Sequence, residues 1–456
     1  MKFTVPVLVF LPIIILSCST QKKTTSSSDY DNSLLEQLPH HIKLTWESDP
    51  ATTQAVCWRT RQGQVESKLQ YTKATPSPFF EDKIITVEAQ SDTFTADDGT
   101  WNYHAVNLEN LDPNTRYSYR VGNNDYWSEW AEFTTATGEN EPFKFLYFGD
   151  VQRFIFSKGS RAIRQAVLHN PDAKFMVFAG DLIHRSAVNI ENWGEFFPAG
   201  GWIFENYPTI ATPGNHEHKW YPDDKTTYEK ITPIWNHSFA FPQNGPEGMK
   251  EETYYVDYNN IRVISLNLVF WSKHKETILK WTEERLKEFK GDWVIMTHHY
   301  NMESAARNRT PGIRYPELKE LYEKYEVPLV LTGHEHLYAR GQMDGVFPVY
   351  AVSVAGPWMN AIRFEEWMDR AGTSLQLFQE IYVSPESLRY VSRTIMGDVY
   401  DEFAISKKAD GTLNYQERPD LGPESLVPPQ NFEDRYDKEL VESYESDKEA
   451  YLNRDK

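Results

Sequence analysis

Histidine, aspartate and asparagine side chains recur in five short blocks in the middle of a chain of 456 residues. Imidazole nitrogens and carboxylate or amide oxygens are donors that proteins offer to transition-metal ions. Two such ions about 3.5–4 Å apart can bind a phosphate, supply a nucleophile and stabilise a leaving oxygen. Together and in this order, the blocks predict a dinuclear site for phosphate-ester hydrolysis. They read FGDVQ at Asp150, FAGDLIH at Asp181, PGNHEH at Asn215, MTHHY at His298 and TGHEH at His334.

A dinuclear site needs a ligand that both ions share, and a carboxylate suits this role because it has two oxygens. We expect Asp181 to be the bridge, since Gly180 before it lets the backbone turn sharply at the end of a strand. Asn215 would add a neutral amide oxygen, which limits the negative charge around a substrate. The other expected ligands divide between the ions, with His298 and His334 on one, and Asp150 and His336 on the other.

Each block follows an apolar run of strand length, and helical patterns separate several of these runs. Strands that alternate with helices predict an α/β domain. Sites in open α/β sheets lie beyond the carboxyl ends of the strands, which is where every expected ligand stands. The apolar runs are 144–148, 174–179, 208–212, 293–296 and 328–331, and the helical patterns are 159–169, 275–289 and 316–326.

Residues 38 to about 136 instead show short strand patterns with turns between them. Polar and apolar residues alternate at 42–46, 55–60 and 117–121, and Asp112, Pro113 and Asn114 form a turn signal. Short strands at regular spacing without helical periodicity predict an all-β sandwich.

The order and wording of the five blocks resemble the calcineurin-like metallophosphoesterases, and within them the purple acid phosphatases. GNHE from Gly214 and GHEHLYAR from Gly333 are the most specific matches. The upstream segment resembles the fibronectin-III-like N-terminal domain of purple acid phosphatases. Its matching stretches are LTWESDPATTQAVCWRT from Leu44, LENLDPNTRYSYRVG from Leu108 and WSEWAEFTTA from Trp127.

The resemblance covers roughly residues 38–360 and implies a fold and an activity. The fold would be a fibronectin-III-like sandwich followed by an α/β metallophosphoesterase domain, a four-layer αββα sandwich. The activity would be hydrolysis of phosphate monoesters by attack of a metal-bound hydroxide, with two ions of iron, zinc or manganese as cofactors. Two alternatives remain: a phosphodiesterase acting on nucleotides or lipid headgroups, and a non-catalytic surface binding protein.

The chain departs from the family pattern near the first metal position. Many calcineurin-like enzymes carry a histidine two residues after the first aspartate, where this chain has Gln152. Purple acid phosphatases take a tyrosine ligand from GDxxY, and His184 stands at that position. We expect His184 to bind metal through nitrogen, so that the colour of a phenolate–iron pair is absent. A supporting role is the alternative for His184. For Gln152 a supporting role is expected, and direct coordination of the metal is its alternative.

The expected catalytic residues are His216 and His299. His216 matches a family position that contacts phosphate, and it would protonate the leaving group if a carboxylate such as Glu217 kept it charged. The family's further histidine pair is absent from residues 300–311, so His299 is the second candidate. Its alternative role is a strand-end residue packed on its neighbour.

Charge and cysteine content restrict location and partners. A net charge of −19 argues against a nucleic-acid-binding surface. Lys2, the apolar residues 5–16 and Ser17 before Cys18 form an export signal. Residues 15–18 resemble a bacterial lipoprotein box, so we expect Cys18 to carry a lipid that holds the protein at the outer membrane, periplasm-facing or at the cell surface. A plain signal peptide or an uncleaved anchor is the alternative, and Cys57 has no cysteine partner.

These patterns divide the chain into five expected parts. Residues 19–37 are polar and would form a flexible tether. The sequence does not determine the oligomeric state. The parts are a lipoprotein signal peptide at 1–18, the tether at 19–37, the sandwich at 38–137, the metallophosphoesterase domain at 141–406 and a charged C-terminal tail at 407–456.

Overall fold

The computed structural model describes residues 37–454, except 64–65, 81–82, 97–98, 185–189 and 222–223. The expected signal peptide, the lipid on Cys18 and all but the last residue of the expected tether lie outside the described residues. Within the described part, no helix combines the length and apolar character needed to cross a membrane.

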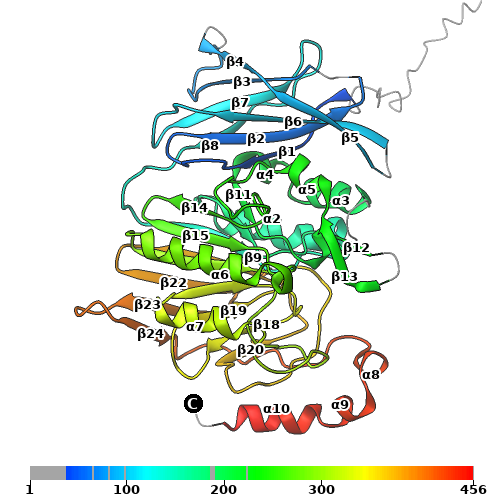
Figure 1. Ribbon diagram of the computed structural model, residues 1–456, viewed down its shortest axis with the longest axis vertical. Coiled ribbons are helices and arrows are strands. Elements are labelled where there is room, and N and C mark those ends of the chain that lie inside the picture. The colour runs from blue at the N-terminus through cyan, green and yellow to red at the C-terminus, as the bar shows by residue number, and fades with distance from the viewer. Residues whose placement is uncertain are drawn as a thin grey trace, which may run out of the picture. The chain divides into compact units, whose positions relative to one another are not determined.

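The first domain is the predicted sandwich of two four-stranded sheets (Figure 1). Alternating apolar side chains such as Trp58, Leu69 and Tyr119 face inward and form its core. The predicted turn precedes β7, where the Tyr117 hydroxyl accepts the Asp112 N–H at 2.9 Å. One sheet comprises β1 (His40–Thr45), β2 (Gln54–Arg61), β6 (Gly99–Leu108) and β5 (Gln90–Ala96), and the other β4 (Ile85–Glu88), β3 (Lys68–Lys73), β7 (Arg116–Gly122) and β8 (Ala131–Thr134).

The second domain contains two seven-stranded sheets that face each other across an apolar core. In the first sheet three parallel strands continue into four antiparallel ones. Its order is β11 (Thr209–Ala211), β10 (Met176–Phe178), β9 (Phe143–Phe148), β21 (Leu377–Val383), β22 (Ser387–Thr394), β23 (Val399–Lys407) and β24 (Leu413–Glu417). The second sheet has the order β14 (Tyr254–Tyr258), β15 (Ile261–Leu266), β16 (Trp293–His298), β17 (Leu329–Thr332), β19 (Val349–Val352), β18 (Tyr338–Gln342) and β20 (Arg370–Gly372).

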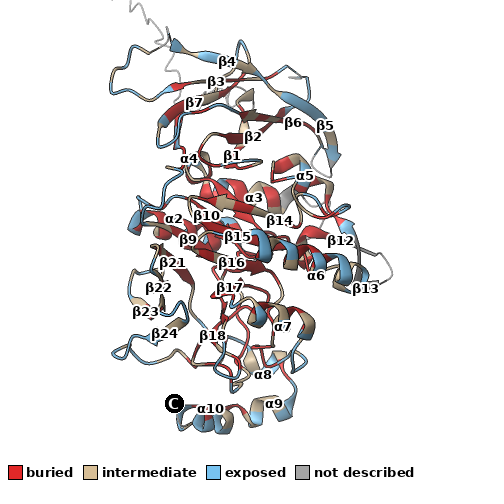
Figure 2. Cartoon of the chain, turned by 60° about the vertical axis from the view of Figure 1, so that its left-hand side comes forward, coloured by how far each residue is buried: buried red, intermediate tan, exposed pale blue. Residues whose placement is uncertain are grey.

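Helices cover the outer faces of both sheets, so the layers follow the predicted αββα order. Their apolar stripes are buried against the strands while their outer faces meet solvent (Figure 2). The first sheet is covered by α2 (Ser160–His169) and the second by α6 (Trp271–Glu288) and α7 (Pro316–Lys324). Further helices lie in the connections: η2 (Ile155–Gly159), α3 (Ile190–Gly200), α4 (Trp202–Asn206), η3 (Asn215–Glu217) and α5 (Pro233–Ser238). The hairpin of β12 (His218–Tyr221) and β13 (Asp224–Ile231) follows η3.

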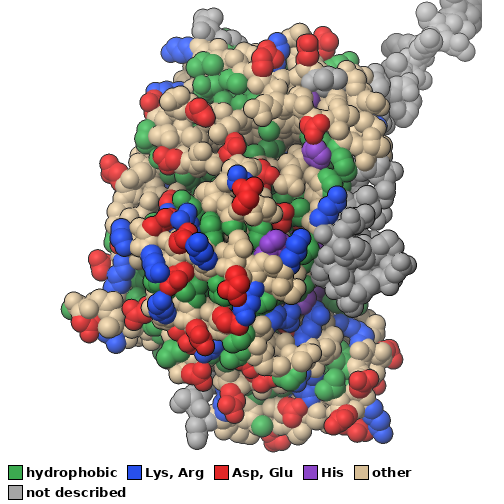
Figure 3. All heavy atoms as spheres, viewed as in Figure 1, with side chains coloured by type: hydrophobic (Ala, Val, Ile, Leu, Met, Phe, Trp, Pro, Cys, Tyr) green, Lys and Arg blue, Asp and Glu red, His purple; other side chains and the backbone are tan. Residues whose placement is uncertain are grey.

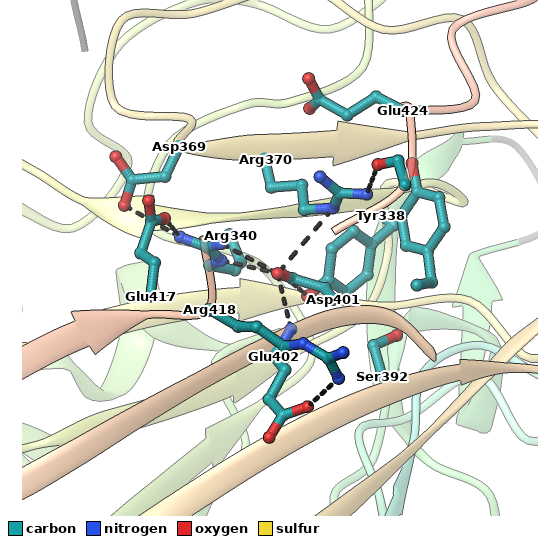
Figure 4. Close-up of polar contacts among 12 residues, drawn as sticks. Tyr338, Arg340, Asp369, Arg370, Ser392, Asp401, Glu402, Glu417, Arg418 and Glu424 are labelled. Carbon is teal, nitrogen blue, oxygen red and sulfur yellow. Dashed lines mark hydrogen bonds and ion pairs between the residues drawn. The ribbon is translucent and has the colours of Figure 1, made fainter. Parts of the chain in front are cut away.

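A buried ion network joins the two sheets at β23 and β18 (Figure 4). Asp401 on β23 is fully buried and accepts two hydrogen bonds from the Arg340 guanidinium on β18, at 2.8 and 2.9 Å. The Tyr338 hydroxyl donates to the same carboxylate at 2.5 Å. Glu417 on β24 also pairs with Arg340. Because Asp401 and Arg340 are paired inside the protein, they tie β23 to the opposite sheet, and the exposed Glu417 adds a contact from β24.

The C-terminal segment corrects the prediction of a charged tail from residue 407. Strand β24 completes the first sheet, so this sheet continues past the predicted boundary at 406. Three short helices then pack on the second domain through Tyr436 and Tyr444, which are buried with Ala361 (Figure 1). Aromatic residues spaced along a polar sequence supply this apolar contact. The helices are α8 (Phe432–Arg435), α9 (Lys438–Glu442) and α10 (Tyr444–Leu452).

Candidate metal centre

The five predicted blocks come together because the strands before them end at the same edge of the two facing sheets. Strands β9, β10 and β11 are parallel neighbours in the first sheet, and β16 and β17 are parallel neighbours in the second. The loops that follow these five strands carry the five blocks. The structure therefore confirms that the blocks meet in space.

Two groups of possible ligand atoms share one carboxylate. Asp181, His299 and His334 form one group, and Asp150, Asp181 and His336 form the other. Within each group the donor atoms lie within 4.8 Å of one another, and all five residues are buried. Asp181 belongs to both groups, which is the arrangement predicted for a bridging ligand.

Hydrogen bonds orient the histidines toward the centre of the site. His299 Nδ1 donates to the Ala179 carbonyl at 2.9 Å, which leaves Nε2 facing inward. That nitrogen lies 3.1 Å from Asn215 Oδ1, 3.2 Å from Asp181 Oδ2 and 3.2 Å from His334 Nδ1. A histidine whose other nitrogen is held by a carbonyl has a defined tautomer and ring orientation, as metal-binding histidines do.

The expectation for His298 and His299 is corrected by this geometry. Successive residues of a strand point to opposite faces, and only His299 points into the site. The His298 ring stacks on Tyr322 of α7, and its Nδ1 donates to the Tyr300 carbonyl at 2.6 Å. Burial lowers the pKa of His298 to about 4. His298 therefore belongs to the packing beneath α7 rather than to the cluster.

On the other side of the bridge, Gln152 lies beside Asp150, Asp181 and His336, where either a supporting role or direct coordination of a metal was expected. Its Nε2 lies 2.7 Å from Asp181 Oδ2, 3.0 Å from His336 Nε2 and 3.5 Å from Asp150 Oδ2. His184 Nδ1 donates to Gln152 Oε1 at 2.8 Å, and His184 joins neither group of ligand atoms. The predicted ligand His184 thus contacts the site through Gln152.

The loops approach one another so closely that two positions require glycine. A Cβ atom on Gly214 would lie 2.2 Å from Asp181 Oδ1, and one on Gly333 would lie 2.2 Å from Asp150 Oδ1. Asp181, His334 and His336 themselves adopt left-handed backbone conformations, with φ of 48°, 71° and 53°. Such conformations are uncommon for residues other than glycine and cluster at functional sites.

The electrostatics of the cluster favour a bound cation. Burial, partly opposed by His299, raises the pKa of Asp150 to about 7. Burial would also raise the pKa of Asp181, but the charges of His299 and His216 outweigh it and lower this pKa below its usual value. Burial disfavours a charged His299, yet the Asp181 carboxylate raises the pKa of His299 to about 9. A proton on His299 here balances two buried carboxylates, as a metal ion would.

His216 and Glu217 follow Asn215 but point in different directions. His216 is largely buried, with its Nε2 3.8 Å from Asp181 Oδ2. Glu217 was expected as a partner that keeps His216 charged, but its carboxylate instead accepts the backbone N–H groups of Asp181 and Gly214 at 2.9 and 2.7 Å. Glu217 therefore clamps two ligand loops together. Glu217 is part of the GNHE motif in the sequence, but only the fold shows that its carboxylate connects these two loops.

A pair of facing sheets with a buried cluster of carboxylates and histidines at one edge is typical of a class of α/β metalloproteins. Residues 143–338 match the model of the calcineurin-like phosphoesterases, and residues 39–135 match the N-terminal domain of purple acid phosphatases. Together these matches cover more than half of the chain. The protein belongs to the calcineurin-like metallophosphoesterases and carries the purple acid phosphatase N-terminal domain.

Relatives of known sequence resemble the chain at low identity. A purple acid phosphatase of Glycine max is 23% identical over 255 residues, which cover 52% of this chain and 53% of the relative. Purple acid phosphatase 23 of Arabidopsis thaliana is 22% identical over 382 residues, or 74% and 79% of the two chains. An uncharacterised Mycobacterium tuberculosis protein is 23% identical over 335 residues, or 66% and 61%. The chain thus spans less than two thirds of the soybean and mycobacterial relatives.

Solved structures share the fold. A purple acid phosphatase from yellow lupin seeds superposes with a TM-score of 0.70 and 18% identity, over 82% of this chain and 75% of that one. The structure of PhoD superposes with a TM-score of 0.63 and 12% identity, over 91% and 98%. The order of a sandwich followed by an αββα domain is therefore shared with the lupin enzyme.

Proposed function

We propose that the protein hydrolyses phosphate monoesters at a dinuclear metal centre. The observation that carries this proposal is the shared carboxylate: Asp181 lies in two buried groups of donors at the edge of a metallophosphoesterase fold. A single structural ion would need one group, whereas two groups with a common member provide for a pair.

We assign six ligands and exchange one of those expected from sequence. His299 takes the place of His298, because its Nε2 faces Asn215, Asp181 and His334. The donors are nitrogen and oxygen without thiolate, which suits iron, zinc or manganese. One relative is named Fe(3+)-Zn(2+) purple acid phosphatase 12 of Arabidopsis thaliana. The six are Asp150, Asp181, Asn215, His299, His334 and His336, while Gln152 and His184 support the Asp150 side.

Bound there, two ions would supply positive charge for the phosphate and an activated water as nucleophile. The side chains of the protein would hold the donor atoms in place and transfer a proton. Burial lowers the pKa of His216, whereas the adjacent Asp181 carboxylate acts in the opposite direction and favours the protonated ring that a proton donor needs. We propose that His216 binds the phosphate through Nε2 and passes a proton from that atom to the departing alkoxide.

The test is hydrolysis measured together with metal content. Purified protein should bind two ions per chain and hydrolyse p-nitrophenyl phosphate faster than its bis(p-nitrophenyl) diester. Asp181→Asn should lose activity and metal, whereas Asp410→Asn, which changes an exposed loop carboxylate, should keep both. Full activity in Asp181→Asn would overturn the proposal, and a faster diester reaction would favour the phosphodiesterase alternative.

We also propose that the protein is exported and held at a membrane by a lipid on Cys18. The support is the N-terminal sequence, with Lys2, the apolar residues 5–16 and Ser17 before the cysteine. In a bacterial host, wild-type protein should fractionate with membranes and Cys18→Ser should not. Equal membrane association of both would refute the lipid anchor.

A further inference from the structure

A cavity of about 780 Å³ lies between η2, the loop around Trp358 and the C-terminal segment. Its wall combines apolar side chains, including Trp358, Leu375 and Ile395, with residues of the C-terminal segment around Asn431. Met396 on its rim is 69% exposed. Ligand cavities commonly have this size and apolar character, and exposed apolar side chains at a cavity mouth mark a surface that binds something.

The charge of this cavity is opposite to that of the chain. Lys158, Arg161 and Arg435 line it, and no aspartate or glutamate does. The chain as a whole has 66 acidic and 47 basic residues. On the face shown in Figure 3, acidic and basic side chains are interspersed over α6 and α7. A wall with three cations and no carboxylate therefore favours an anionic ligand.

A fourth cation adds to the unbalanced charge. The guanidinium carbons of Arg153 and Arg435 both lie over the Trp358 ring, 3.6 and 4.3 Å from its centroid. Arg435 donates to the neutral oxygens of Met359 and Asn360, so its charge is not neutralised. Across the described residues, no carboxylate lies within ion-pair distance of these four cations.

The cavity wall is connected to the proposed metal centre through Trp358 and Phe154. His336 Nδ1 donates to the Trp358 carbonyl at 3.2 Å. The backbone of Trp358 thus orients a proposed ligand, while the side chain of the same residue lines the cavity. Phe154, which also lines the cavity, follows Gln152 by two residues. Arg153 and Phe154 both adopt left-handed backbone conformations. The cavity wall therefore begins two residues from Gln152 and contacts His336 through the backbone of Trp358.

We propose that this cavity binds the alcohol part of the phosphate ester, and that this part carries an apolar ring and a second negative charge. The inference rests on the proposed function, because it takes the phosphate to lie at the metal centre. The ring would pack against the apolar wall. The second anion would face Lys158 and Arg161, which are both exposed.

The test compares matched substrates and matched variants of the metal-loaded protein. The substrates are phenyl phosphate and 4-carboxyphenyl phosphate. Lys158→Gln/Arg161→Gln removes two cations from the cavity. Lys273→Gln/Lys280→Gln removes two exposed cations from α6, so it has the same net charge. Taking the ratio of variant to wild type for each substrate cancels the intrinsic reactivity of the two leaving groups.

We expect the cavity variant to lower kcat/KM for 4-carboxyphenyl phosphate roughly two- to thirtyfold more than for phenyl phosphate, the effect of losing two solvent-facing ion pairs. The excess should shrink at high ionic strength, and the α6 variant should show none. As a second variant, Trp358→Leu should lower kcat/KM for phenyl phosphate more than for glycerol phosphate while metal content is kept. Equal losses for both members of each pair would overturn this inference and leave the proposed function standing. Failure of metal-loaded wild type to hydrolyse any of the esters would overturn both.

Discussion

Replacing either of two adjacent histidines by phenylalanine should have opposite consequences for metal binding. His299→Phe removes the nitrogen that faces Asp181, Asn215 and His334. Loss of even a supporting hydrogen bond to a ligand costs about 10–100-fold in metal affinity. Loss of a donor atom itself should therefore weaken binding at its ion by more than ~100-fold and abolish activity.

His298→Phe should leave the metal centre intact. The phenyl ring can keep the stacking on Tyr322, and the variant loses the hydrogen bond to the Tyr300 carbonyl, worth about 0.5–1.5 kcal/mol. It also removes Nε2, which is buried without a hydrogen-bond partner among the described residues, and such an atom costs about 1–3 kcal/mol. The two effects oppose each other, so the free energy of unfolding should change by no more than about 2 kcal/mol.

Metal content by elemental analysis, activity and chemical denaturation of both variants test this pair. The metal-free forms of each should unfold cooperatively, which separates loss of a ligand from loss of the fold. We expect two ions and near wild-type activity for His298→Phe, and loss of at least one ion for His299→Phe. A His298→Phe protein without metal, beside a His299→Phe protein that retains both ions, would refute the assignment.

Three further changes test stability and positioning. Asp401→Asn leaves the buried Arg340 short of a partner and should lower the free energy of unfolding by about 3 kcal/mol; a loss below ~1 kcal/mol in urea denaturation would contradict the role of the network. Burial lowers the pKa of Lys43 from 10.5 to about 7. Between these pH values Lys43 is protonated in the unfolded chain and neutral in the folded one. The free energy of unfolding therefore rises with pH, by up to ~1.4 kcal/mol per pH unit. Lys43→Met should be more stable than wild type near pH 7 and should lack this rise. If the unfolding free energies of wild type and variant changed equally with pH between 7 and 9, a buried neutral lysine would be refuted. Glu217→Gln should weaken metal binding about 10–100-fold by loosening two ligand loops, and unchanged affinity in a metal titration would contradict the clamp.

Local patterns were enough to predict the elements that carry the site. The predicted helices at 159–169, 275–289 and 316–326 correspond to α2 (Ser160–His169), α6 (Trp271–Glu288) and α7 (Pro316–Lys324). Their amphipathic spacing is a property of the sequence, since one face must be apolar to cover a sheet. The C-terminal segment was predicted poorly because scattered aromatics such as Tyr436 and Tyr444 give no local periodicity and find their partners far away in the chain.

The sequence by itself determined the two-domain order, the kind of donor atoms and their position after strands, because each depends on residue type and short-range periodicity. Only the tertiary structure decided which of His298 and His299 faces Asp181, that Glu217 clamps the loops, and that Gln152 stands between His184 and the cluster. These choices depend on strand direction and on contacts between residues distant in sequence. The cationic cavity also exists only after residues near 154, 358 and 431 have come together, so no local pattern could predict it.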